Sequence, residues 1–168
     1  MAIVIEAPKR FFNKKLTSLF LAGGITNCPQ WQNDLIKYLK DIDDLVIYNP
    51  RRKNLPIHDS GAAEEQITWE YDYLKKCDII SFWFSKGSLN PIVLYELGMY
   101  GNSDNRIIFI GMDTEYERKR DVIVQTELAR PDVKIVYSLK DLADQIKNRL
   151  FIDDFELNVP IGFTQISE

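Results

Sequence analysis

Two acidic residues, Glu70 and Glu96, stand in largely apolar stretches of the sequence, where a carboxylate needs an explanation. Asn90 precedes a proline, a pair typical of a helix start, and Glu96 follows in the second turn of that helix. Glu70 shares a predicted helix face with Ile67 and Leu74, so we expect its side chain to point toward the core. Each acid therefore needs a structural partner or a chemical role.

A pair of carboxylates is what chemistry at the anomeric carbon of a glycoside requires. Its transition state resembles an oxocarbenium ion, which a nearby carboxylate stabilises and can attack covalently. A second carboxylate orients the nucleophile or handles a proton on the leaving group. The helix start near Glu96 favours its anion. The alternative, that Glu70 and Glu96 are capping or salt-bridging acids, stays open on spacing alone.

The elements that would position these acids alternate along the chain. Apolar runs predict strands over residues 18–22, 45–48, 79–84, 106–110 and 133–137, with a further short edge strand possible over 2–6. Helices are expected over 28–40, from about 64 to 77, from 91, over 121–128 and over 138–150. This order predicts one three-layer α/β domain over residues 1–150, with a mainly parallel five-stranded sheet of the flavodoxin or Rossmann type. Residues 151–168 are predicted to form a C-terminal tail.

Parallel sheets bind ligands beyond the carboxyl ends of their strands, where the strand order reverses. The segments predicted to lie there are 23–24, 49–52, 85–96 and the residues from 111 onward. Gly23 and Gly24 would let backbone amides approach a sugar or phosphate, although a tight strand–helix turn explains the pair equally well. Arg51 and Arg52 suit bidentate capture of a 5′-phosphate, with surface salt bridges as the alternative.

Composition narrows the function classes. The formal charge of -4 argues against a dedicated nucleic-acid binder. Two distant cysteines and a single loop histidine, His58, predict neither a disulfide framework nor a metal site, and no cofactor is implied. No apolar stretch is long enough for a membrane span or a signal peptide, so we expect a cytoplasmic protein without a membrane partner. The aromatic residues Trp69, Tyr71 and Trp83 could stack a base, but core packing is the more common role.

Three stretches, SLFLAGGIT, WEYDYLKKCDIISFWF and LNPIVLYELGMYG, resemble the nucleoside 2-deoxyribosyltransferase family and its nucleoside 5′-monophosphate N-glycosidase relatives. The shared pattern places an acid eight residues before the Asp that opens the third strand, followed by an ELG motif, and the resemblance spans roughly residues 18–137. It implies that Glu96 is the nucleophile that takes C1′ of the sugar as an ester. It also implies that Glu70 is the helper acid, where the family usually carries Asp.

The resemblance extends to the substrate site. Asn90 falls where relatives contact the 5′ end of the sugar, and it can cap the helix as well. Phe20 stands where many members carry Tyr, and Asp121 aligns with a polar residue that a neighbouring subunit lends to the site. A nucleoside or nucleotide substrate and a homo-oligomer, a dimer or larger, are therefore expected. A deoxyribosyltransferase, a nucleotide N-glycosidase and a non-catalytic nucleotide sensor all remain compatible with these residues.

Overall fold

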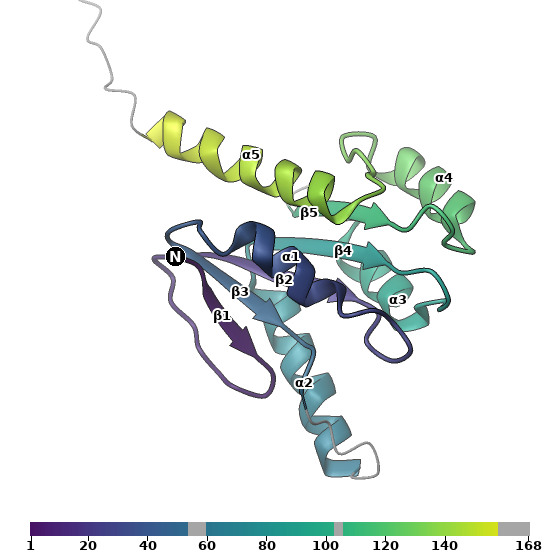
Figure 1. Cartoon of the computed structure of the whole chain (residues 1–168), viewed down its shortest axis with the longest axis horizontal. Coiled ribbons are helices and arrows are strands. Elements are labelled where there is room, and N and C mark those ends of the chain that lie inside the picture. Colours follow the sequence, from purple (N-terminus) through teal and green to yellow (C-terminus); the bar gives the residue numbers. More distant parts are fainter. Residues whose placement is uncertain (54–59, 103–105, 158–168) are drawn as a thin grey trace, which may run out of the picture.

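The computed structural model describes residues 1–53, 60–102 and 106–157 and confirms the predicted α/β class (Figure 1). All strand pairs in its five-stranded sheet are parallel, and the strand order is β1-β3-β2-β4-β5. The strands are β1 (Ile3–Glu6), β2 (Thr17–Gly23), β3 (Leu45–Asn49), β4 (Ile79–Phe84) and β5 (Ile107–Met112). The helices are α1 (Trp31–Leu39), α2 (Ser60–Lys76), α3 (Pro91–Tyr100), α4 (Lys119–Ala129) and α5 (Leu139–Leu157). The predicted loop histidine, His58, lies outside the described residues.

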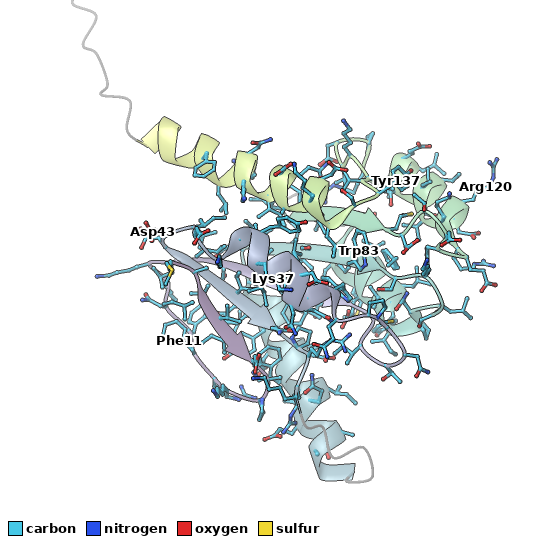
Figure 2. All side chains as sticks on the ribbon, viewed as in Figure 1. Phe11, Lys37, Asp43, Trp83, Arg120 and Tyr137 are labelled. Atoms are coloured by element: carbon cyan, nitrogen blue, oxygen red, sulfur yellow. The ribbon has the colours of Figure 1, made fainter. Side chains whose placement is uncertain are left out.

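The sheet is covered by helices on both faces, which explains its apolar strands. Helices α1 and α5 pack on one face, and α2, α3 and α4 pack on the other (Figure 1). Every residue of β3 and β4 is buried as a result. Trp83, at the end of β4 (Figure 2), belongs to the core on the α1 and α5 face. Trp69 is a residue of α2 and is fully buried in the core on the other face, so neither tryptophan is free to stack a base.

The predicted strand over 133–137 is wrong. Val133 donates its N–H to the Arg130 carbonyl in a turn, and Val136 alone pairs with Gly111 in an isolated bridge. The chain reaches the edge of β5 for a single residue before the next helix begins, so no ladder forms. The fifth strand is instead β1, the edge candidate at the N-terminus.

The predicted end of the last helix is also wrong. Helix α5 continues to Leu157, so residues 151–157 of the predicted tail are helical. These residues contain neither glycine nor proline, so nothing in the local sequence stops the helix at residue 150.

The buried face of α2 matches the prediction at Leu74 but not at Ile67. Ile67 is 66% exposed and Tyr71 is 50% exposed, whereas Trp69 and Tyr73 are buried. The two buried rings lie 4.5 Å apart between centroids, and Tyr73 also packs at 4.2 Å on Tyr48 of β3. Aromatic packing onto the sheet therefore sets the rotation of this helix, and the aliphatic spacing used for the prediction does not.

Candidate functional site

A cavity of about 380 Å³ opens at the carboxyl ends of β2, β3 and β4. Consecutive connections leave β2 toward β3 on one side and β4 toward β5 on the other, so the strand order reverses here. Seven of the nine predicted site residues line this cavity: Phe20, Gly23, Gly24, Arg52, Glu70, Asn90 and Glu96. Arg51 and Asp121 do not.

The two carboxylates reach the cavity from different helices, Glu70 from α2 and Glu96 from α3. Burial raises the pKa of Glu96 to about 8, and the nearby negative charge of Glu70 adds to this rise. Burial also raises the pKa of Glu70, against a hydrogen bond from Gln66 that lowers it. Because a second negative charge beside ionised Glu70 is disfavoured, Glu96 holds a proton at neutral pH.

Neither acid plays the structural part that spacing alone allowed. In the described part of the chain, no lysine or arginine forms an ion pair with Glu70 or Glu96. Both lie beyond the first turn of their helices, so neither caps a helix start. Two unpaired carboxylates in one cavity are typical of a functional site rather than a stabilising one.

Gly24 allows a close approach at the cavity wall. A Cβ at this position would overlap with the Oδ1 atom of Asn90 and the Sγ atom of Cys28. At Gly23, a Cβ would overlap with the ring of Trp31 and would lie 2.7 Å from the Trp83 carbonyl oxygen. The turn after β2 therefore needs glycine because of packing, and it lies directly against the start of α3.

Asn90 precedes α3 but makes no capping hydrogen bond, so the predicted side-chain cap is wrong. Its backbone is left-handed with a φ of 49°, a conformation that asparagine tolerates better than most residues. The side-chain Nδ2 donates instead to the carbonyls of Ser85 and Ser88, at 3.2 and 2.9 Å. Asn90 thus stabilises the turn after β4 while its Oδ1 faces the turn at Gly24. The helix does begin at Pro91, as predicted.

Arg51 holds the loop between β2 and α1. Its Nε donates to Gln32 Oε1 and one terminal nitrogen donates to the Pro29 carbonyl, both at 2.8 Å. The same nitrogen makes longer hydrogen bonds of 3.4 Å to the carbonyls of Gly24 and Cys28. This guanidinium donates its hydrogen bonds to Gln32 and to the loop, so it stabilises the wall of the cavity and does not line the cavity itself.

Arg52, by contrast, lines the cavity itself. Its largely buried guanidinium forms a 3.0 Å ion pair with Glu65 at the surface of α2. Of the two adjacent arginines, only Arg52 is therefore placed to contact a ligand. The predicted joint capture of a phosphate by both guanidiniums does not fit these contacts.

Asp121 lies away from this cavity. It is exposed on α4, forms an ion pair with Arg118 at 3.1 Å, and borders a separate hollow of about 320 Å³ between α3 and α4. Within a single chain it therefore cannot contact a ligand bound between Glu70 and Glu96.

Gln66 is a cavity residue that the sequence analysis missed. It precedes Glu70 by four residues on α2, which places both side chains on the same face of the helix. That spacing from a suspected catalytic acid is the signal that could have identified it. Ser88 and Thr26, which also line the cavity, carry no comparable signal.

Comparison with known proteins identifies a family that matches the chain. The family described as nucleoside 2-deoxyribosyltransferase like matches residues 16–114, which is more than half of the chain and runs from β2 through β5. No curated protein matches the chain. Within the described residues, no helix is long and apolar enough to cross a membrane. The matched segment contains every residue that lines the cavity, and the chain belongs to the nucleoside 2-deoxyribosyltransferase-like family.

Proposed function

We propose that this protein cleaves the N-glycosidic bond of a (deoxy)nucleoside or nucleotide, with Glu96 as the nucleophile and Glu70 as the helper acid. The observation that carries this proposal is that two carboxylates line one cavity at the switch point of the sheet and form no ion pair with a described residue. Membership of the family supports a nucleoside as the substrate.

In the proposed reaction, the Glu96 carboxylate attacks C1′ and the bond between C1′ and the base nitrogen breaks. Before the attack, the proton of Glu96 passes to Glu70, and Glu70 then gives it to the base, which leaves with the electron pair of the broken bond. An ester between Glu96 and the sugar results. Attack of water on C1′ completes a hydrolysis, whereas attack of a second base completes a transfer, and either step restores the carboxylate.

Polar side chains line both ends of the cavity, and they support binding of such a substrate at both of its ends. Ser88, Asn90 and the N-terminus of α3 lie at the β4 end, where a 5′-hydroxyl or 5′-phosphate would be stabilised. Arg52 lies at the β3 end, two strands away in the sheet. Because Arg51 is hydrogen-bonded to the loop between β2 and α1, Arg52 alone of the two arginines would contact the ligand.

A chromatographic assay for free base tests the proposal. The protein is incubated with each deoxynucleoside and each deoxynucleoside 5′-monophosphate, with and without a second base. We expect base release that falls on the order of 10³-fold or more in Glu96→Gln. Exchange onto the added base would identify a transferase, and release without an acceptor would identify an N-glycosidase. Binding of a nucleotide by calorimetry without any release would contradict the proposal and favour a nucleotide sensor.

A further inference from the structure

We propose that Gln66 is a positioning residue that fixes Glu70 and, by donating a hydrogen bond to its carboxylate, keeps Glu70 ionised while Glu96 holds the proton. This inference rests on the function proposed above, but its central test does not require turnover.

The geometry gives Gln66 two partners. Its Nε2 donates to Glu70 Oε1 at 2.7 Å and to the Pro50 carbonyl at 2.8 Å. Both partners are acceptors, so the opposite orientation of the amide would place its oxygen against a carbonyl and a carboxylate. Gln66 is only 7% exposed, and Pro50 directly follows β3. The side chain therefore anchors Glu70 to the carboxyl end of the sheet.

The other atom of the amide shows why Gln66 is unusual. In the described part of the chain, its Oε1 is buried without a hydrogen-bond partner. A buried, unsatisfied oxygen is destabilising, and an apolar residue of the same size would avoid this cost. The need for two N–H donors explains an amide at this position, because one N–H donates to Glu70 and the other to the Pro50 carbonyl.

The surrounding charges determine where the proton lies. Among the residues that the structure describes, two charged side chains line the cavity around Glu70: Glu96 from α3, and Arg52 after β3, which is already paired with Glu65. The residues of β2 that line the cavity carry no titratable group. Donation from Gln66 stabilises the ionised form of Glu70, and the resulting negative charge raises the pKa of Glu96. Glu96 therefore holds the proton in the unliganded protein.

The test is a carboxyl NMR titration of the full chain labelled with ¹³C-glutamate, with resonances assigned through Glu70→Gln and Glu96→Gln. Gln66→Leu removes the donor while keeping the volume. We expect the pKa of Glu70 to rise by about one unit, whereas Glu96 should still titrate last, because Glu70 is already ionised when Glu96 loses its proton. A general loosening of the fold would instead lower the pKa of both groups, because it would hydrate them.

Gln145→Leu is the matched control. Gln145 lies on α5 away from the cavity, donates its Nε2 to the Lys134 carbonyl at 2.9 Å, and also has a buried Oε1 without a partner in the described structure. This variant loses an equivalent amide–carbonyl bond, so both glutamate titrations should stay unchanged. Gln66→Met provides a second apolar replacement if the leucine variant does not fold.

An unchanged titration of Glu70 in both Gln66 variants, or a fall in the pKa of both glutamates, would overturn the inference. Absence of base release together with a raised pKa of Glu70 would reject the proposed reaction and keep the role of Gln66.

Discussion

The charge state of Glu96 is the single-residue property on which the proposed chemistry depends. Attack on C1′ requires the carboxylate, yet burial and the charge of Glu70 raise its pKa to about 8. The family motif around Glu96 is readable in the sequence, whereas this electrostatic state is not. It arises from the convergence of α2 and α3, so it depends on tertiary structure.

The raised pKa predicts a pH-dependent stability. The folded pKa of about 8 lies above the unfolded value of 4.5, so the folded protein binds more protons between these values. The stabilisation is complete below about pH 4.5 and is lost as the pH rises through 8. Glu96→Gln, which mimics the protonated form, should be more stable than the wild type at pH 8 by on the order of 4 kcal/mol. Thermal unfolding between pH 5 and pH 8.5 measures this difference.

The exposed Glu127 on α4 offers a control for this measurement. Glu127→Gln should follow the wild-type curve at every pH. If the advantage of Glu96→Gln were the same at pH 5 as at pH 8, Glu96 would not be buried in its neutral form.

The close contact at Gly24 predicts a second single-residue effect. In Gly24→Ala, the new methyl group displaces Asn90 or Cys28, with an expected loss of about 1–3 kcal/mol in the free energy of unfolding. Ligand binding should weaken because the start of α3 moves. Gly98→Ala is the matched control, since open space surrounds that position on α3, and it should not destabilise the protein. Chemical denaturation measures the free energy of unfolding of both variants, and equal values would contradict the packing argument.

The site residues named by the family pattern lie together in the cavity, except for Asp121. The partners of the two arginines could not be read from the sequence. Arg51 and Arg52 are adjacent and chemically identical. The side chain of Arg51 nevertheless contacts the loop after β2, whereas that of Arg52 lines the cavity. Gln66 was missed for a similar reason, because its hydrogen bonds depend on the end of β3.

At the scale of elements, the loop between β2 and α1 depends on the fork of hydrogen bonds from Arg51. Arg51→Lys keeps the charge but cannot donate to Gln32 and Pro29 together. We expect amide hydrogen exchange over residues 24–30 to accelerate by about tenfold, which corresponds to about 1.4 kcal/mol. Arg52→Lys should leave the exchange of this loop unchanged, because Arg52 pairs with Glu65 instead. Equal acceleration in both variants would argue against a specific clamp.

The elements themselves were largely predictable where apolar runs are long. Strands β2 to β5 follow from their apolar composition. The run over 133–137 has the same composition, but it meets the sheet only at Val136, and sequence alone does not show how far a segment runs alongside its neighbour. The rotation of α2 was unpredictable because ring packing between Trp69 and Tyr73 outweighs the aliphatic spacing.

At the scale of the whole molecule, one surface remains apolar. Helix α3 carries apolar residues on all sides, and Ile92, Tyr95 and Met99 are exposed at helical spacing. Ile67 and Tyr71 are exposed on α2. Helices that are apolar all round are usually buried, so we expect this surface to contact a second copy of the chain. Such a contact is also needed if Asp121 is to reach a neighbouring site.

This surface predicts the effect of one substitution on the oligomeric state. Tyr95 is 66% exposed, and Tyr95→Lys should shift the protein toward the monomer, because a buried charge would oppose association. Tyr137→Lys, on the face that carries α5 (Figure 2), is the matched control and should leave the mass unchanged. Light scattering measures the mass, and a monomeric wild type would contradict the expectation.

The most direct test of the proposed mechanism is to trap the covalent intermediate on Glu96. A 2′-fluorinated deoxynucleoside, whose fluorine destabilises the oxocarbenium-like transition state, should release its base once and leave the sugar on the enzyme. Intact-protein mass spectrometry followed by peptide mapping should find the added sugar on Glu96 and no adduct in Glu96→Gln. Base release without an adduct, or an adduct on Glu70, would contradict the assignment of Glu96 as the nucleophile.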